Sequence, residues 1–200
     1  MKSLINRLKK QNKRISVAES CTGGLISKMI TDTAGASAVF DCAVTVYSNE
    51  FKTKLLGVRE ETLDEFGAVS EQTAREMASG VLNLSGADIA LSVTGIAGPS
   101  NDGSKKPVGT VCIGVATNEK CYATTFVFAG SRAEVRRMAA KMALNMAYDE
   151  LGTAKKTAKT KKTVKIKTSA KKTAKTAVTK TKSAITKSKS AINKLIKKDK

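Results

Sequence analysis

Small hydroxyl, thiol and glycine side chains follow directly on a short hydrophobic run near the N-terminus. The run 15–18 has the apolar composition of a buried strand, and apolar residues at helical spacing resume at Leu25. Between these two segments stand groups that can attack a carbonyl, bind an anion or let a ligand approach closely: Ser20, Cys21, Thr22, Gly23 and Gly24. This stretch is therefore the first candidate for a site.

The two glycines give this turn a specific chemical use. Glycine adopts positive φ without strain and leaves room for a ligand beside the backbone. The unpaired N–H groups of a first helical turn form an anion or oxyanion pocket. We therefore expect a helix to open near Gly23 with its first N–H groups facing the site. The alternative is a strand-to-helix turn that only packs tightly, with Thr22 as the N-cap.

The absence of histidine limits the chemistry. None of the 200 residues is His, so Ser-His-Asp and Cys-His nucleophilic systems and histidine metal sites are excluded. A general base must then be Lys, Tyr or a carboxylate. The four cysteines show no CxxC spacing, which excludes a zinc knuckle and is typical of reduced thiols in the cytosol. No run is apolar enough to span a membrane, so we expect a cytoplasmic protein.

Two further strands are expected to end in polar loops. A strand over 39–47 runs into Ser48 and Asn49, either of which can cap a helix that reaches Leu56. A strand over 87–93 runs into a glycine-rich loop, 94–109, and long loops of this kind often carry function. Sites in α/β sheets collect at strand ends, so these two loops join 20–24 as candidate site positions.

The remaining pattern predicts an α/β fold. A hairpin is expected from 108–117 and 121–128, and a final helix opens with a capping box at Ser131 and Glu134. That helix should end at Gly152. Further helices are expected over 4–8, 23–33, 62–66 and 71–84. The buried stripe of the last helix is predicted to be Val135, Met138, Met142 and Met146. The order indicates a mixed sheet of four or five strands covered by helices.

The charge divides the chain into two parts. The segment 153–200 holds 18 Lys and a single acid, so it carries +17 of the total net charge of +19, and residues 1–152 are close to neutral. Its Lys, Thr, Ala and Ser cannot bury enough apolar surface to fold, so disorder is expected. Many lysines bind phosphate backbones without sequence preference, which makes nucleic acid the expected partner of 153–200. A weakly amphipathic stretch, 184–198, leaves an anionic membrane surface as a minor alternative.

Seven short motifs within residues 12–151 occur in the order and spacing of one family. They are AESCTGG at 18–24, VYSNEFK at 46–52, LLGV at 55–58, GAVSE at 67–71, SVTGIAGP at 92–99, KPVGTV at 106–111 and SRAEVRR at 131–137. With these motifs the chain resembles the C-terminal domain of the competence/damage-inducible CinA family, whose stand-alone form is the nicotinamide-nucleotide amidohydrolase.

The resemblance implies a three-layer α/β/α sandwich and an enzyme that deamidates nicotinamide mononucleotide to nicotinate mononucleotide and ammonia. It also implies neither a metal nor an organic cofactor. Larger family members carry an additional N-terminal domain. Nothing in the family pattern corresponds to residues 153–200, and a homo-oligomer is expected for the folded part.

By resemblance, Ser20 is the nucleophile and forms a nicotinoyl ester, while the N–H groups around Thr22, Gly23 and Gly24 are the candidate oxyanion hole. Lys52 and Tyr47 are the expected proton carriers. Lys28 is the competing lysine. Cys21 is a rival nucleophile, because a helix N-terminus lowers the pKa of a thiol.

The substrate's phosphate requires cations or N–H donors. Arg132 and Arg136 share a helix face and suit bidentate contact, whereas Arg137 is offset; the alternative is that this cluster is only a solvated helix surface. The expected substrate-binding residues are Thr22, Gly23, Gly24, Asn49, Thr94, Gly95, Gly98, Gly109, Thr110, Arg132 and Arg136. The competing function is a catalytically silent domain that carries the polycation to DNA or RNA.

Overall fold

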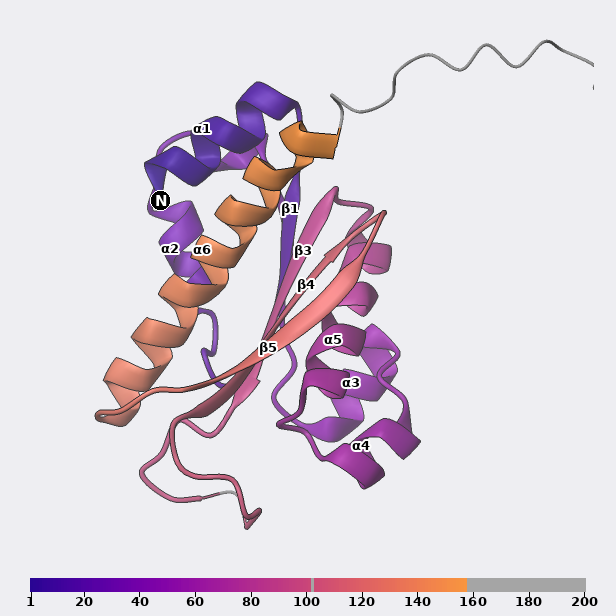
Figure 1. Ribbon diagram of the computed structural model, residues 1–200, viewed down its shortest axis with the longest axis vertical. Coiled ribbons are helices and arrows are strands. Elements are labelled where there is room, and N and C mark those ends of the chain that lie inside the picture. The colour runs from indigo at the N-terminus through magenta and orange to yellow at the C-terminus, as the bar shows by residue number, and fades with distance from the viewer. Residues whose placement is uncertain (102, 158–200) are drawn as a thin grey trace, which may run out of the picture. The chain divides into compact units, whose positions relative to one another are not determined.

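A mixed five-stranded sheet forms the centre of the protein (Figure 1). The computed structural model describes residues 1–101 and 103–157. The strand order is β2-β1-β3-β4-β5. Strand β1 pairs in parallel with both β2 and β3, whereas β4 is antiparallel to β3 and to β5. The three parallel strands therefore end at one edge of the sheet, where the loops that follow them can meet.

The predicted strands are confirmed, with shifted ends. The observed strands are β1 (Ile15–Glu19), β2 (Phe40–Thr45), β3 (Ile89–Gly95), β4 (Thr110–Thr117) and β5 (Cys121–Val127). Strand β2 begins later than expected because residues Ala36–Ala38 form a 3₁₀ turn. It also ends before Tyr47, so that residue lies in the loop. Strands β4 and β5 form the expected hairpin.

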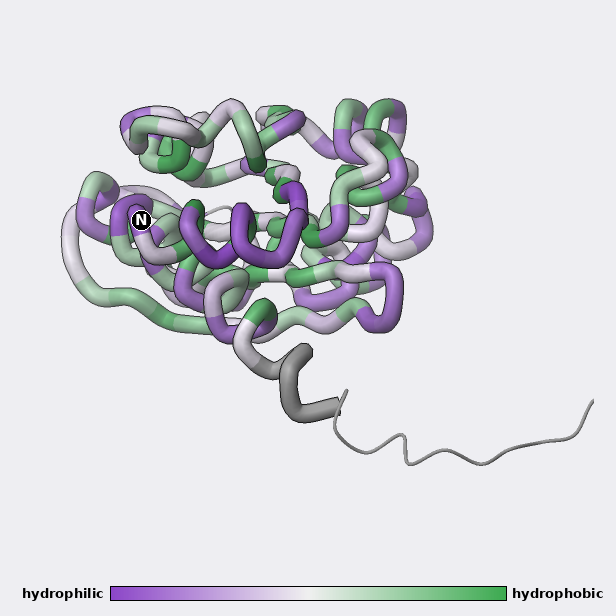
Figure 2. Tube along the Cα trace, turned by 90° about the horizontal axis from the view of Figure 1, so that it is seen from above, coloured by the Kyte–Doolittle hydropathy of each residue, from purple (hydrophilic) through white to green (hydrophobic). Residues whose placement is uncertain are grey.

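In the described part of the chain, six α-helices cover the two faces of the sheet, as expected for a three-layer α/β/α sandwich. They are α1 (Lys2–Gln11), α2 (Leu25–Thr31), α3 (Asn49–Leu56), α4 (Glu60–Phe66), α5 (Glu71–Ser85) and α6 (Arg132–Thr157). Helices α1, α2 and α6 lie on one face, and α3, α4 and α5 lie on the other (Figure 1). Hydrophilic and hydrophobic residues mix along the helical coils (Figure 2), as expected where one side of a helix packs on a sheet.

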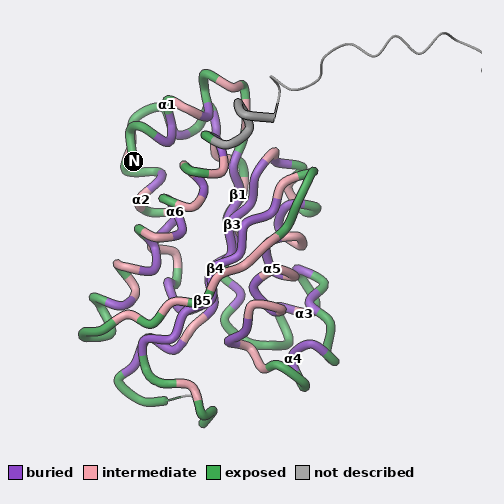
Figure 3. The backbone as a smooth tube through the Cα atoms, in the orientation of Figure 1, coloured by how far each residue is buried: buried purple, intermediate pink, exposed green. Residues whose placement is uncertain are grey.

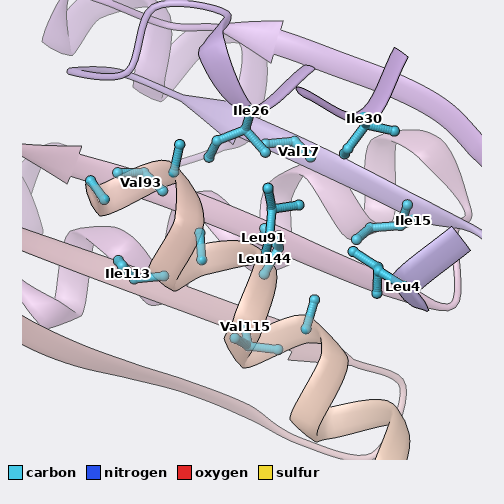
Figure 4. Packing of buried hydrophobic residues seen from close by; sticks show 14 of the residues in the cluster. Leu4, Ile15, Val17, Ile26, Ile30, Leu91, Val93, Ile113, Val115 and Leu144 are labelled. Atoms are coloured by element: carbon cyan, nitrogen blue, oxygen red, sulfur yellow. The ribbon is translucent and has the colours of Figure 1, made fainter. Parts of the chain in front are cut away.

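Alternation along β1 directs its side chains into two separate cores. Val17 packs in the cluster formed with α1, α2 and α6, whereas Ala18 belongs to the cluster formed with α3, α4 and α5. The first cluster includes Leu91 and Leu144, which lie close together between the sheet and α6 (Figure 4). Because β1 is buried on both faces, all five of its residues are buried (Figure 3).

The buried face of α6 differs from the prediction. Val135 is buried as expected, but Met138, Met142 and Met146 are only partly buried. The buried side chains are mostly alanines with two leucines: Ala139, Ala140, Ala143, Leu144, Ala147 and Leu151. Alanine brings the helix axis close to the sheet, and the longer methionines then flank the contact. The stripe is thus rotated from the predicted one.

The C-terminal end of α6 also differs from the prediction. The helix does not end at Gly152 but continues to Thr157, so the first five residues of the lysine-rich segment are helical rather than disordered. Gly152 lies close to Arg7 of α1, whose guanidinium donates to Tyr148 O at 2.7 Å. The expected disorder of the remaining lysine-rich segment, and the amphipathic stretch 184–198, lie outside the described residues.

Candidate active site at the carboxyl ends of the parallel strands

The three polar loops named by the sequence are joined by two arginines of α6. Arg132 donates to Gly98 O at 2.7 Å and to the phenol oxygen of Tyr47 at 3.1 Å. Arg136 donates to Thr22 O at 2.7 Å. The loops that follow β1, β2 and β3 therefore each receive a guanidinium N–H from one helix. The structure brings these predicted residues together in one place.

The capping box at the start of α6 explains why these arginines face the loops. Glu134 accepts from the Ser131 N–H at 2.8 Å, which is one half of the predicted capping box, and also from the Ser131 hydroxyl at 2.7 Å. These hydrogen bonds lower the pKa of the Glu134 carboxyl. With the first turn fixed, Arg132 and Arg136 are one turn apart on the same face of the helix. Arg132 is exposed, whereas Arg136 is half-buried.

Ser20 continues the pairing of β1 beyond the end of the strand. Its N–H donates to Val93 O at 2.9 Å, so the chain is still extended there. Alternation along β1 then places Ser20 on the side of Ala18, which faces α3, α4 and α5. Ser20 is 8 % exposed, so its hydroxyl lies at the edge of the buried interior.

A buried carboxylate that the sequence did not single out fixes the turn after Ser20. Glu19, which is fully buried, accepts from the N–H groups of Ile26 at 3.1 Å and Ser27 at 2.9 Å, and from the Ser27 hydroxyl at 2.6 Å. A carboxylate at this position satisfies helix N–H groups and interacts favourably with the helix dipole. The expectation that the first-turn N–H groups of α2 are free for an anion is therefore wrong for Ile26 and Ser27.

The turn itself retains polar groups without partners. Gly23 and Gly24 adopt φ of 56° and 88°, and Gly24 is the N-cap of α2. Thr22 is therefore not the N-cap, and its buried hydroxyl lacks a hydrogen-bond partner among the described residues. Within the same residues, the N–H groups of Cys21, Thr22 and Gly24 donate to no other residue. Three backbone donors and a hydroxyl thus remain available beside Ser20.

Lys52 is buried in the layer that Ser20 faces. It comes from α3, where Ser48 is the N-cap and accepts from Phe51 N at 3.3 Å, and it is only 1 % exposed. Its amine donates to Tyr47 O at 3.2 Å. Burial lowers the pKa of Lys52, while the charge of a Cys21 thiolate would raise it. The Val46 N–H donates to Glu19 O at 2.9 Å, so the loop that leads to Tyr47 and Lys52 starts beside the residue that precedes Ser20.

The competing lysine lies in a different environment. The Lys28 amine is exposed and pairs with Asp32 at 2.6 Å, four residues along α2. Tyr47 is 63 % exposed, and its phenol oxygen contacts Arg132 while its carbonyl contacts Lys52.

Cys21 differs chemically from Ser20. It is 6 % exposed and packs in the cluster with α2 and α6, on the opposite side of the sheet from the predicted direction of Ser20. Burial raises the pKa of its thiol to about 12, and the nearby Arg136 and Arg132 lower that pKa only in part. Little of the thiol is therefore ionised at neutral pH, which makes this side chain a poor nucleophile.

Thr94 and Thr110, expected in substrate binding, have hydroxyls that are already bonded. The Thr94 hydroxyl donates to Ala68 O and the Thr110 hydroxyl donates to Pro107 O, both at 2.7 Å, and both residues are buried. At Gly95 and Gly109 a Cβ would lie 2.7 and 2.0 Å from the carbonyl oxygens of Thr110 and Phe128. Close packing of the backbone is sufficient to explain these two glycines.

Asn49 is the exposed first residue of α3. Gly98 takes part in the cluster through its carbonyl, which accepts from Arg132. Among the described residues, no group of three or more Cys, Asp or Glu side chains is arranged to hold a metal ion. Within the same part of the chain no helix is both long and apolar enough to cross a membrane.

The family model of the CinA C-terminal domain matches residues 1–151 of this chain. This range includes every residue of the candidate active site described above. The chain belongs to the CinA C-terminal domain family.

Relatives with CinA-type names are similar in sequence to residues of this domain. A putative competence-damage inducible protein of Caldicellulosiruptor bescii is 54% identical over 143 residues, which are 72% of this chain and 35% of that protein. A CinA-like protein of Endomicrobium trichonymphae is 52% identical over 145 residues, 72% of this chain and 34% of that protein. The chain thus spans about a third of the length of the curated relatives that it matches.

Solved CinA structures match the whole folded part. The competence damage-inducible protein A of Klebsiella pneumoniae subsp. pneumoniae MGH 78578 superposes with a TM-score of 0.74 at 36% identity, covering 76% of this chain and 94% of that one. The competence/damage inducible protein CihA of Agrobacterium tumefaciens gives a TM-score of 0.72 at 40% identity, covering 76% and 92%. Chains of about this domain's size therefore adopt the same CinA fold.

Proposed function

We propose that this CinA domain is an amidohydrolase that converts nicotinamide mononucleotide to nicotinate mononucleotide and ammonia. The observation that carries the proposal is the buried amine of Lys52, with its lowered pKa, in the layer that Ser20 faces. A chain without histidine needs another base near neutral pH. A lysine meets this need only when desolvation favours its neutral form.

The acylation step follows from these groups. The neutral Lys52 amine takes the Ser20 hydroxyl proton as the oxygen attacks the amide carbon of the nicotinamide. The carbonyl oxygen becomes an oxyanion, which the free N–H groups of Thr22 and Gly24 can stabilise. When the tetrahedral intermediate collapses, the Lys52 ammonium returns the proton to the departing nitrogen. Ammonia leaves, and a nicotinoyl ester of Ser20 remains.

Hydrolysis reverses the same proton path. Lys52, neutral again, takes a proton from a water molecule that attacks the ester, and then gives it to the Ser20 oxygen as that bond breaks. The products are regenerated Ser20 and a carboxylic acid on the pyridine ring, which releases its proton to water and becomes the carboxylate. Tyr47 is the alternative proton carrier. Its phenol oxygen is held by Arg132, and its carbonyl oxygen accepts from the amine of Lys52.

The nucleotide part of the substrate requires a cation near the same loops. Arg132 is exposed and uses its two terminal nitrogens on Gly98 O and Tyr47, which leaves N–H groups directed to solvent. A guanidinium in this position suits a phosphate oxygen. The glycine backbone at Gly95 and Gly98 and the exposed Asn49 are the remaining proposed contacts with the substrate.

One assay tests the activity. Purified protein is incubated with nicotinamide mononucleotide, and both ammonia and nicotinate mononucleotide are measured, with and without a metal chelator. Stoichiometric formation of the two products that persists with chelator supports the proposal. An intact, folded protein that releases neither product contradicts it. Activity lost with chelator and restored only by added zinc would contradict the serine mechanism.

A second proposed function concerns residues 153–200. Their 18 Lys and single acid favour the binding of a polyanion, and we propose duplex nucleic acid. A variant that ends at Thr157 keeps the whole of α6, and it should keep the amidohydrolase activity while losing salt-sensitive DNA binding. Tight DNA binding retained by this variant would contradict the assignment. Localisation in the cytoplasm and homo-oligomer formation stay predictions.

A further inference from the structure

Arg136 contacts the nucleophile's turn rather than open solvent. Its Nη2 atom donates to Thr22 O at 2.7 Å, and its Nε atom is buried without a partner among the described residues. A Cβ on Gly23 would lie only 3.3 Å from Nη2. The guanidinium is therefore packed against the backbone of the turn, which is not the open, solvated arrangement expected of a group that waits for a phosphate.

The peptide bond between Thr22 and Gly23 connects Arg136 to Ser20. At one end of this peptide the Thr22 carbonyl accepts from Arg136 and from the Leu25 N–H at 3.2 Å. At the other end the Gly23 N–H donates to Ser20 O at 3.1 Å. The chain of hydrogen bonds thus runs from a guanidinium through one peptide unit to the carbonyl of the proposed nucleophile. Such bonds polarise one another and resist displacement together.

This chain of bonds leaves neighbouring N–H groups unused. With the Gly23 N–H held on Ser20 O, the N–H groups of Cys21, Thr22 and Gly24 donate to no other described residue. Their direction depends on the orientation of the peptide plane that Arg136 fixes. Loss of the guanidinium would release this plane and misalign both the Ser20 side chain and the donors beside it.

We infer that Arg136 is a positioning residue for Ser20, acting through the Thr22–Gly23 peptide, and does not hold the substrate's phosphate. In this respect it differs from Arg132, which is exposed and contacts two loops that lie further from Ser20 along the chain. The kinetic part of the following test rests on the proposed amidohydrolase activity. The structural part does not.

The kinetic test compares Arg136→Ala and Arg136→Lys with Arg137→Ala. Arg137 is exposed on the same helix and serves as the matched control. A positioning role predicts that kcat falls by roughly 10²-fold in Arg136→Ala with KM nearly unchanged, because small misplacement of a nucleophile has that effect. The same fold-change should appear with nicotinamide riboside, which lacks the phosphate. A rise in KM confined to the nucleotide would overturn the inference.

The structural test is hydrogen–deuterium exchange of the full chain without substrate. Arg136→Ala should accelerate exchange of amides in peptides that cover 21–25, where the Gly23 N–H is bonded to Ser20 O, and leave β3 unchanged. Arg136→Lys keeps the positive charge but loses the planar guanidinium donor, so exchange at 21–25 should also become faster in this variant. It replaces Arg136→Ala in the test if Arg136→Ala does not fold. Unchanged exchange in a folded variant would overturn the inference even if no turnover is found.

Discussion

The loops after β1 and β3 leave the same edge of the sheet side by side, yet they use their polar groups differently. At the two ends of the loop after β3, the hydroxyls of Thr94 in β3 and Thr110 in β4 are bonded to backbone carbonyls. In the loop after β1, the Thr22 hydroxyl and three backbone N–H groups lack partners among the described residues, and Lys52 is buried in the layer that Ser20 faces. The hydrogen bonds of the first arrangement stabilise the fold. The second keeps polar groups free, which is the expected state of groups that react with a substrate.

The largest effect is expected at the centre of the β1 loop. Ser20→Ala should lower kcat by at least roughly 10³-fold and leave KM nearly unchanged, because the attacking oxygen is lost. Lys52→Ala should have a similar effect, and the double variant should be little worse than either single variant. Ammonia release and substrate binding measured separately check this. Normal turnover by Ser20→Ala would show that Ser20 is not the nucleophile.

A smaller effect is expected at Gly23, where φ is 56°. Gly23→Ala forces a side chain into the left-handed region at a cost of about 1 kcal/mol and presses a methyl group toward Arg136. We expect kcat to fall by roughly 10²-fold. Gly103, with φ of 87° in the β3 loop and open space for a Cβ, is the matched control. Equal losses of activity in both variants would remove the distinction between the loops.

The burial of Lys52 should also appear in the pH dependence of stability. Its pKa is lowered in the folded state, so the unfolded chain binds more protons between that lowered pKa and about 10.5. The free energy of unfolding should therefore rise with pH across this window, and Lys52→Met should remove the rise. Urea unfolding at several pH values checks this. A pH slope that is the same in both proteins would mean that the amine is solvated.

At Thr94, in β3 just before the loop, the expected change is in stability rather than activity. Thr94→Val keeps the shape of the side chain but leaves Ala68 O without its hydrogen bond, which should lower the free energy of unfolding by about 1–2 kcal/mol. Both kcat and KM should stay within about twofold of wild type, since a bonded and buried hydroxyl has no part in the proposed chemistry. A large rise in KM would instead make this loop a substrate contact through its side chains.

The smallest effect is expected at Cys21. Cys21→Ala should stay active, because burial raises the pKa of the thiol to about 12 and only a trace of thiolate is present. For the same reason iodoacetamide should label the exposed Cys121 well before Cys21. Mass spectrometry of the labelled peptides measures both rates. Rapid labelling of Cys21 at neutral pH, together with an inactive Cys21→Ala variant, would favour the thiol as nucleophile.

The sequence predicted the fold and the three loops because strand and turn signals are local. The hydrophobic run 15–18 and the glycines at 23 and 24 are sufficient for a strand that turns into a helix. The choice between Lys52 and Lys28 required burial, which depends on residues far apart in the chain. Sequence spacing gives no direct measure of that burial.

Glu19 is an instructive omission. It belongs to the AESCTGG motif, and an acid shortly before a helix start is a signal for N-terminal capping. The capping role of Glu19 could not be recognised from the sequence, because capping residues usually stand directly before the helix and Glu19 is the last residue of a strand. Its carboxylate reaches Ile26 and Ser27 across the turn, a distance that only the tertiary fold reveals. The buried stripe of α6 was mispredicted for the related reason that small side chains, which carry little hydrophobic signal, make the closest contacts.

The adjacency of Glu19 and Ser20 limits how the family can vary in length. These neighbours point to opposite faces of the sheet, one toward α2 and the other toward the layer of Lys52. Insertion or deletion of one residue in β1 would exchange them, placing the carboxylate beside the amine and the hydroxyl in the other core. Evolutionary gaps should therefore be absent between Ile15 and Gly24. They should gather instead in the exposed stretch from Gly103 to Lys105, where the chain can be longer or shorter without moving a reacting atom.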